Sequence, residues 1–152
     1  MPPELRLNAF LPYRLSIASN RVSDAIAETY RALFGLRIPE WRLVAVIAES
    51  EGLTQQALGQ ATRMDKVTVS RATAALAERG LVTRTPNPGD QRSHLLALTP
   101  AGHALYAEVA PKALEMEARI FGDFSAAELA SMNAMLERLE KAVDALDAAP
   151  TT

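Results

Sequence analysis

The chain of 152 residues lacks cysteine altogether and is poor in aromatic residues, which make up 5% of it. Without cysteine, disulfide bonds, thiolate metal sites and thiol-based redox sensing are excluded. No apolar run reaches the ~18 residues that a membrane-spanning helix requires. Segment 1–6 lacks the basic and then apolar pattern of a signal peptide. We therefore expect a cytoplasmic protein that has no membrane partner.

The residue patterns of catalysis and cofactor binding are also missing. We find no nucleophile beside a base, no glycine-rich phosphate loop and no group of metal ligands at matched spacing. The two histidines, His94 and His103, are too few for a zinc site without cysteine. The chain is predicted to have no catalytic residue, no metal and no cofactor, and not to be an enzyme.

The net charge of −2 shows no basic excess, but the charge is unevenly distributed along the chain. Between Thr62 and Thr99 six basic side chains stand against three acidic ones, whereas from Glu115 onward eight acidic side chains stand against three basic ones. Local charge, and not the sum over the chain, steers a protein toward phosphate. Segment 62–99 is therefore a candidate for nucleic-acid binding.

Hydrophobic residues make up 49% of the chain, which is enough for a single domain, 1–152, with a buried core. The spacing of apolar residues, together with capping residues and helix-ending glycines, predicts six helices. Their expected ranges are 11–34, 40–51, 55–61, 66–79, 100–121 and 126 to about 149. Two β-leaning runs, 81–85 and 94–98, flank the turn-forming segment 87–93 and predict a hairpin. The expected fold class is mainly α with a small β-hairpin (α+β).

Segment 40–99 has the element order of a winged helix-turn-helix, in which two short helices are followed by a hairpin, the wing. Thr54 and Asp65 stand where these two helices need N-caps, and Gly80 ends the second one. Such an arrangement fits one helix into a DNA major groove and can place an arginine-bearing loop over the minor groove. We expect 40–99 to be a DNA-binding lobe.

On a helical wheel of 66–79, the first two turns carry small, hydroxyl-bearing and cationic residues opposite an apolar side. Arg71 can form two hydrogen bonds to guanine, and Thr68 and Ser70 can reach base edges or phosphates. Val67 can contact a thymine methyl group, and Lys66 at the helix start is suited to phosphate. We predict these five residues as DNA contacts, although the pattern taken alone also fits a solvated helix.

The hairpin adds three candidate DNA-binding residues. Asp90 and Arg92 are two residues apart, so they share one side of a strand, and the carboxylate can hold the guanidinium in a fixed pose. Arg92 would then enter the minor groove or brace the loop, and Arg84 on the other strand would contact phosphate. The alternative is an exposed ion pair that contributes little.

The last helix carries apolar residues at alternating spacings of three and four, the narrow seam of a coiled coil. The seam residues are Leu129, Met132, Leu136, Leu139 and Val143. We expect this seam to pack against another subunit. An amphipathic helix packed within its own monomer is the alternative.

The sequence resembles the MarR (multiple antibiotic resistance regulator) family of bacterial winged-helix repressors. The resemblance rests on segment 65–71, on Gly80-Leu81-Val82, and above all on Asp90-x-Arg92 followed by Leu98-Thr99-x-x-Gly102.

This resemblance implies a six-helix homodimer joined through the helices at 11–34 and 100–147. It also implies a pseudo-palindromic operator in double-stranded DNA, a recognition helix at 66–79 and a minor-groove role for the wing, Arg92 included. Members of the family often respond to small aromatic ligands bound between the dimer helices and the DNA-binding lobe.

Aromatic and cationic side chains gather in the first helix and at the start of the second. In this respect the sequence resembles the branch of the family that responds to aromatic acids of the hydroxycinnamate type. The candidate effector-binding residues are Tyr13, Arg14, Arg21 and Trp41. We expect a small aromatic acid or acyl thioester as effector, with an arginine pairing its carboxylate. Alternatively, Trp41 is a core residue, and Arg14 and Arg21 form interface ion pairs or contact DNA phosphates.

The leading hypothesis is a homodimeric, DNA-binding transcriptional repressor released by such an effector. A winged-helix module that binds other proteins and no specific DNA is the alternative, because a fold does not determine its function. The basic segment 62–99 and the small residues on the exposed side of helix 66–79 favour DNA.

Overall fold

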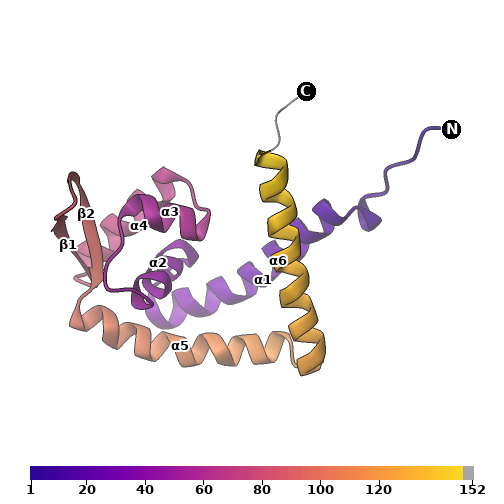
Figure 1. Ribbon diagram of the computed structural model, residues 1–152. Helices are drawn as coiled ribbons and strands as arrows, with labels where there is room; N and C mark the ends of the chain where they lie inside the picture. The colour runs from indigo at the N-terminus through magenta and orange to yellow at the C-terminus, as the bar shows by residue number, and fades with distance from the viewer. Residues whose placement is uncertain (149–152) are drawn as a thin grey trace. The chain divides into compact units, whose positions relative to one another are not determined.

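The computed structural model describes residues 1–148 and contains six α-helices and one two-stranded sheet over that range (Figure 1). After a short 3₁₀ helix at Leu7–Ala9, the elements are α1 (Leu11–Phe34), α2 (Ile38–Ala48), α3 (Gln55–Thr62), α4 (Lys66–Glu78), β1 (Val82–Asn87), β2 (Asp90–Leu98), α5 (Pro100–Ile120) and α6 (Ala126–Ala148). The predicted fold class is therefore confirmed. The predicted end of the last helix near Ala149 lies outside the described residues. Over residues 1–148, each helix is too short or too polar to cross a membrane.

Internal contacts divide the chain into two compact units. The first runs from Met1 to Met116, and the second begins at Glu117 and contains α6. The boundary falls inside α5, so the division into a DNA-binding lobe at 40–99 and dimerisation helices at 11–34 and 100–147 stays a prediction.

Capping residues set most helix ends where the sequence places them. Thr54 Oγ1 accepts the backbone N–H of Ala57 at 3.1 Å, and Asp65 Oδ1 accepts that of Thr68 at 2.8 Å. Gly35 follows α1 in the left-handed conformation, with φ at 63°, which glycine adopts without steric cost. As a result α1 has the predicted ends, and α3 and α4 differ from prediction by one residue.

Helix α2 differs from its predicted range of 40–51 at both ends. It begins at Ile38 because the Glu40 carboxylate accepts the backbone N–H of Arg37 at 3.1 Å, a cap formed without a serine or threonine. It ends at Ala48, where the hydroxyl and the backbone N–H of Ser50 both bond to the Ile47 carbonyl, each at 3.0 Å. The helix therefore stops three residues before its predicted end at residue 51.

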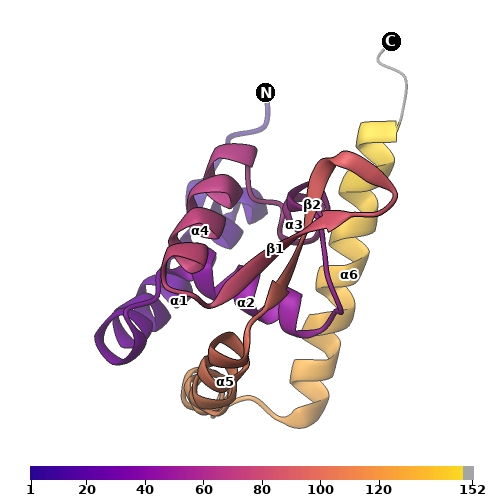
Figure 2. The ribbon, with the colours of Figure 1, turned by 90° about the vertical axis from the view of Figure 1, so that its left-hand side faces the viewer.

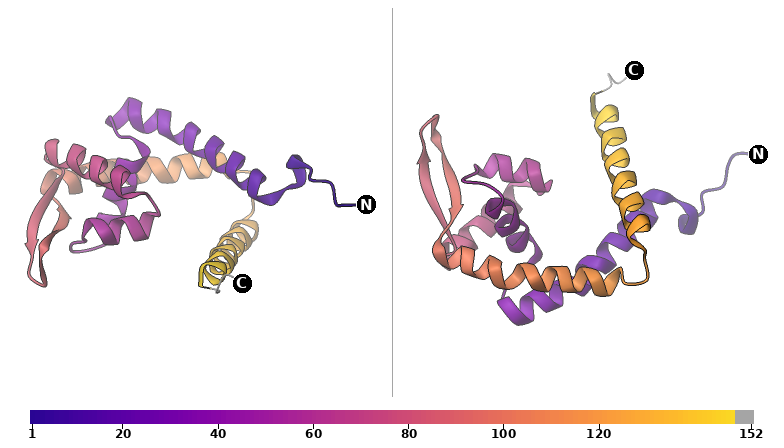
Figure 3. Two further views of the ribbon diagram at one scale, coloured as in Figure 1. Left: turned by 90° about the horizontal axis from the view of Figure 1, so that it is seen from above. Right: turned by 60° about the horizontal axis from the view of Figure 1, so that its bottom comes forward.

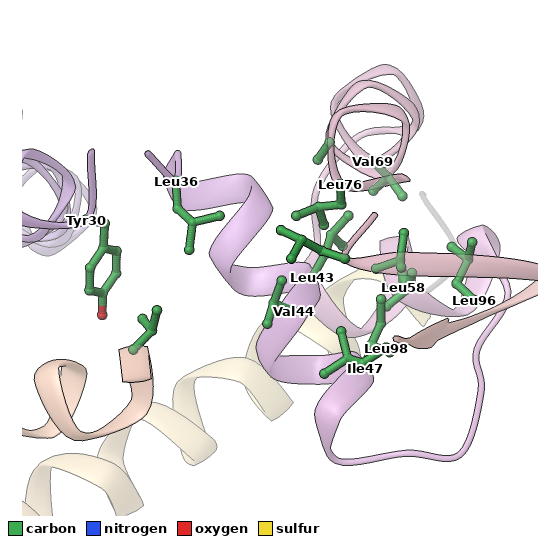
Figure 4. Packing of buried hydrophobic residues seen from close by; sticks show 14 residues of the cluster. Tyr30, Leu36, Leu43, Val44, Ile47, Leu58, Val69, Leu76, Leu96 and Leu98 are labelled. Carbon is green, nitrogen blue, oxygen red and sulfur yellow. The ribbon is translucent and has the colours of Figure 1, made fainter. Parts of the chain in front are cut away.

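The core of the first unit is built around α2 (Figure 4). Leu43, Val44 and Ile47 of this helix are at most 2% exposed. Around them lie Leu58 of α3, Val69 and Leu76 of α4, and Leu96 and Leu98 of β2. Trp41 and Ala48, which follow the helical spacing of Val44, are only half-buried, whereas Leu43 outside that spacing is fully buried. Because α2 packs against three elements, its buried side is wider than a single stripe.

The wing is an antiparallel hairpin in which Val82 pairs with Leu98 and Asn87 with Asp90 (Figure 2). Its strands are longer than the predicted 81–85 and 94–98, so the turn is reduced to Pro88 and Gly89. The segment 87–93 was expected to be a loop, but β2 already begins at Asp90, with an irregularity in register at Pro86/Asn87.

Thr73 of α4 is 1% exposed, and within the described chain its hydroxyl has no hydrogen-bond partner. A buried polar group without a partner carries a desolvation cost that an apolar group of similar shape avoids. Thr73→Val should therefore raise the free energy of unfolding, measured by urea denaturation, by about 1 kcal/mol. Thr62→Val is the matched control, because the Thr62 hydroxyl donates to the Leu58 carbonyl at 2.6 Å and its loss should destabilise. Destabilisation by Thr73→Val would contradict the prediction.

Candidate nucleic-acid interface

Helix α4 separates its residues into the two sides that the sequence predicts. Val69, Ala72, Thr73 and Leu76 are buried against the core, whereas Lys66, Val67, Ser70 and Arg71 are exposed. The apolar Val67 is 57% exposed on the same side. The exposed side of α4 is therefore free to meet a partner, and the hairpin flanks the α3–α4 pair in each view (Figures 1–3).

Thr68 has a structural role at the start of α4 in addition to its predicted DNA contact. Its hydroxyl donates to Asp65 Oδ2 at 2.9 Å, while its backbone N–H donates to Asp65 Oδ1. The Thr68 side chain is half-buried, and its hydroxyl proton is used by the cap. In this arrangement Thr68 can offer DNA only its acceptor lone pairs.

The hydrogen bonds from the backbone and side chain of Thr68 hold the pKa of Asp65 below its usual value of 3.8. A lowered pKa in the folded state stabilises the fold above the usual pKa, and this stabilisation is lost as the pH falls through the lowered value. Asparagine caps a helix equally well but does not titrate. The stability difference between the wild type and Asp65→Asn should therefore shift toward the variant only below about pH 4, measured by urea denaturation between pH 6 and 3. A difference that is constant over this range would contradict the prediction.

The wing brings Arg84 of β1 and Arg92 of β2 to one exposed surface. Together with the first turn of α3 they border a hollow of about 470 Å³, which we call the wing hollow. Its lining includes Gln55 and Gln56 of α3, Arg84 of β1, and Arg92, His94 and Leu96 of β2.

Asp90 does not hold the Arg92 guanidinium, contrary to the sequence-based expectation. Its Oδ1 accepts the backbone N–H of Arg92 at 2.9 Å, and no ion pair joins the two side chains in the described chain. The carboxylate thus stabilises the turn, together with Asn87, whose side chain bonds to Gly89 N–H and Ser93 Oγ. The turn is shaped by Asp90, and the guanidinium of Arg92 remains available to a partner.

A second hollow, of about 650 Å³, lies between α3 and the start of α4, and we call it the helix hollow. Lys66 and Val69 line it from α4, and Gln55, Gln56 and Gln60 line it from α3. The sequence reasoning did not include the glutamines among the candidate contacts. Their position in the first helix of the helix-turn-helix, directly after the Thr54 cap, is the signal that could have identified them.

The four candidate effector residues do not converge within one chain. Tyr13, Arg14 and Arg21 are exposed on α1, whereas Trp41 is half-buried between Tyr30 and Tyr106, with ring centroids 5.6 and 5.9 Å away. Tyr13 precedes Tyr30 on the same helix by about 25 Å at 1.5 Å per residue. These contacts agree with Trp41 being a core residue, and an effector site made of all four residues stays a prediction.

The seam of α6 is open to solvent in the single chain. Leu136, Leu139 and Val143 are 41–47% exposed, and Leu129 and Met132 are half-buried. In α1, Leu11, Tyr13, Leu15 and Ile17 are likewise exposed at 38–71%. Exposed apolar side chains gathered on one helix are typical of surfaces that pack against another element or polypeptide, and the predicted role of the seam in a dimer stays a prediction.

Comparison with known proteins agrees with this architecture. Residues 34–93 match the MarR family. The transcriptional regulator HosA of Escherichia coli is 30% identical over 90 residues, which cover 59% of this chain and 67% of HosA. The chain belongs to the MarR family. It is a winged-helix transcriptional regulator.

Solved structures show the same fold. A MarR/EmrR family regulator from Acinetobacter sp. ADP1 superimposes with a TM-score of 0.85 at 24% identity, covering 92% of this chain and 99% of the other. CouR from Rhodococcus jostii RHA1, solved with p-coumaroyl-CoA bound, has a TM-score of 0.78 at 24% identity and covers 90% and 95%. At this identity the two structures support the MarR fold and leave the effector of this member open.

Proposed function

We propose that this MarR-family regulator is a repressor that binds a pseudo-palindromic DNA operator as a homodimer and is released by a small aromatic acid or its thioester. One observation carries the DNA-binding part of the proposal. The exposed side of α4, with Arg71 among small residues, lies in the same compact unit as a hairpin that exposes Arg84 and Arg92.

Each proposed contact follows from the chemistry of its side chain. Arg71 reads guanine in the major groove, Ser70 reaches a base edge or phosphate, and Val67 meets a thymine methyl group. Lys66 and Arg84 bind phosphates, and Arg92 enters the minor groove, while Thr68 and Asp90 set the geometry of α4 and the wing.

Helix α4 has only thirteen residues, so a single copy can contact few base pairs, and a dimer would double that number. Two copies of α4 placed one turn of B-DNA apart, about 34–36 Å, would read both halves of an operator. An effector that changes this spacing needs a coupling of only about 1–3 kcal/mol to release DNA. The apolar α6 seam is the proposed contact between the copies.

Arg71→Ala tests DNA recognition. We expect a loss of about 1–3 kcal/mol in operator binding and a relaxed preference at one base position, because a bidentate guanine contact is removed. The measurement uses a duplex that the wild-type protein selects from a random pool, titrated at several salt concentrations. Arg42→Ala, an exposed arginine of α2 outside the proposed contacts, is the matched control.

A specific complex must weaken steeply with salt as counterions are released. If Arg71→Ala binds with unchanged affinity and unchanged sequence preference, Arg71 of α4 does not read bases in the major groove. Binding that is absent or insensitive to salt in the wild type would support the protein-binding alternative.

The aromatic effector draws support from the aromatic and cationic residues of α1 and from the fold that this chain shares with CouR. Tyr13 lies about 25 Å along α1 from Tyr30, the residue of this helix that packs on Trp41. We therefore infer that residues of a second subunit complete the site. Thermal unfolding with p-coumarate and p-coumaroyl-CoA, followed by release of the selected duplex, tests this inference. The inference is refuted if no aromatic acid or thioester stabilises the protein and none releases the duplex.

A further inference from the structure

The C-terminal ends of α1 and α4 are joined by the side chain of Arg79, although more than 40 residues separate them in the chain. Arg79 Nη2 donates to the Phe34 carbonyl at 3.1 Å, and Nη1 donates to the Gly35 carbonyl at 3.3 Å. Phe34 is the last residue of α1, and Arg79 directly follows the last residue of α4. Within residues 1–148, no other side-chain hydrogen bond joins these two helices.

The chemistry of two helix ends favours a cation between them. The last carbonyl groups of a helix have no partner within that helix, and they give its end a partial negative charge. Two such ends therefore repel each other unless a positive group lies between them. The Arg79 guanidinium provides that charge together with several N–H donors in a rigid fork. It binds the end of α1 and offsets the repulsion.

Apolar packing alone leaves α1 free to roll on the rest of the unit. The apolar residues of α1 that pack against the core, Ile26, Tyr30 and Phe34, follow one another at intervals of four and form a single row. Contact along one apolar row is non-directional, whereas a hydrogen bond requires a defined distance and angle. Beside Arg79 and Gly35 lies a hollow of about 570 Å³, so side chains do not fill the space between α4 and the α1–α2 connection. The Arg79 fork therefore fixes the direction of α1.

We propose that Arg79 is a positioning residue, which fixes α4 relative to α1 and thereby sets the half-site spacing that the dimer accepts in its DNA operator. This inference rests on the proposed function, because α1 is a predicted dimerisation helix and α4 is the proposed recognition helix. In such a dimer the direction of α1 in each copy determines where α4 of that copy lies. The distance between the two copies of α4 is then only as well defined as the attachment of α4 to α1.

Arg79→Ala tests the proposal on the duplex selected by the wild type and on versions with one base pair inserted or removed at the centre. One base pair moves a half-site by about 3.4 Å along the DNA axis. Wild-type affinity should fall about 100-fold on this change, because the two copies of α4 no longer reach their half-sites together. Arg79→Ala should bind the original duplex about tenfold more weakly, since hydrogen bonds from a charged donor are lost. Its further loss on insertion or removal should be only about tenfold.

Arg31→Ala is the matched control, because Arg31 lies in the last turn of α1 but donates to Glu28 of its own helix at 2.8 Å. Its affinity and its loss on insertion should equal those of the wild type. Arg79→Lys keeps the positive charge without the fork, so its loss on insertion should lie between those of the wild type and Arg79→Ala. Thermal unfolding confirms that each variant is folded, and Arg79→Lys carries the test if the alanine variant does not fold.

The alternative role of Arg79 is direct contact with a DNA phosphate. Loss of such a contact would reduce the slope of log affinity against log salt by about 0.9 and leave the loss on insertion unchanged. A positioning residue gives the opposite result, because its guanidinium does not meet the DNA. An unchanged loss on insertion in Arg79→Ala would overturn the inference and leave the proposed function intact. Failure of the wild type to select any duplex would overturn the proposed function itself.

A second measurement needs no DNA. The chain has no cysteine, so Ala74→Cys on the exposed side of α4 provides a single site for a spin label in each copy. Double electron–electron resonance then gives the distribution of distances between the two copies of α4. We expect a narrow distribution with Arg79 present and a broader one when Arg79→Ala is added. Equal widths would overturn the inference, and a labelled protein without dipolar coupling would overturn the proposed dimer.

Discussion

Leu136→Gln combined with Leu139→Gln is expected to convert the protein to monomers and to weaken operator binding about 100-fold or more. The two leucines are 42% and 41% exposed in the single chain, so a second subunit has apolar area left to bury. A dimer contains four such side chains. Full burial of a leucine is worth about 1.5–3 kcal/mol, so burying the two fifths of each that is still exposed contributes roughly 0.6–1.2 kcal/mol. Without the dimer the two half-sites are bound independently, and the gain from a linked second contact is lost.

Glutamine is chosen because it favours helix and adds no charge that would repel DNA. Ala134→Gln is the matched control, since Ala134 is exposed and lies on the opposite side of α6 at 100° per residue. Sedimentation equilibrium measures the oligomeric state, and titration with the selected duplex measures affinity. A variant that remains dimeric would place the interface outside the α6 seam, and a monomer with wild-type affinity would refute the requirement for a dimer.

The features of the fold that depend on local sequence could be predicted. The four buried residues of α4 follow from the helical period alone, because one side of this helix packs on the core. The caps at Thr54 and Asp65 follow from residue type and position, since each side-chain oxygen bonds a backbone N–H three residues later. These same local rules positioned Lys66, Ser70 and Arg71 on the exposed side.

The features of the fold that depend on contacts between residues distant in sequence could not be predicted as well. Helix α2 is surrounded on several sides, so its burial follows from its neighbours and not from an amphipathic period. The early end of the same helix depends on Ser50, whose hydroxyl competes for the Ile47 carbonyl. In the wing, the pairing of Asn87 with Asp90 extends both strands beyond the β-leaning residues.

The candidate site shows the same division. Arg71, Arg84 and Arg92 were identified from charge and position, and the structure places all three on the surface. Gln55 and Gln56 were not, because an uncharged residue in a short helix has no distinguishing pattern until the wing is seen beside it. Tyr13 and Trp41 are grouped by composition, but composition cannot show that the length of α1 separates them.

Gly102→Ala is expected to lower the free energy of unfolding by about 3 kcal/mol, because the added methyl group has no space. A Cβ atom built on Gly102 would lie 2.1 Å from the carbonyl oxygen of Leu81 and 3.2 Å from Leu98 Cδ2. The first obstacle is backbone, so it cannot move aside as a flexible side chain could. The start of α5 would have to separate from the base of the wing.

That junction also holds the end of α4 through Thr99. The Thr99 hydroxyl donates to the Gly80 carbonyl at 2.6 Å and accepts the backbone N–H of Gly102 at 3.0 Å, while the Thr99 N–H donates to the Leu81 carbonyl at 3.0 Å. The Leu98-Thr99-x-x-Gly102 motif therefore joins the end of α4, the wing and α5 at one point. A displacement of α5 at Gly102 should disturb DNA binding as well as stability.

Gly59→Ala is the matched control, because Gly59 also lies inside a helix but its Cβ would meet only ordinary contacts at 3.6 Å or more. Alanine is the better helix former, so Gly59→Ala should raise stability by up to about 1 kcal/mol. Urea denaturation of both variants measures the contrast, and titration with the selected duplex measures its consequence for the operator. If Gly102→Ala were as stable as the wild type, the close contact between α5 and the wing could not exist, and the motif would have to act through Thr99 alone.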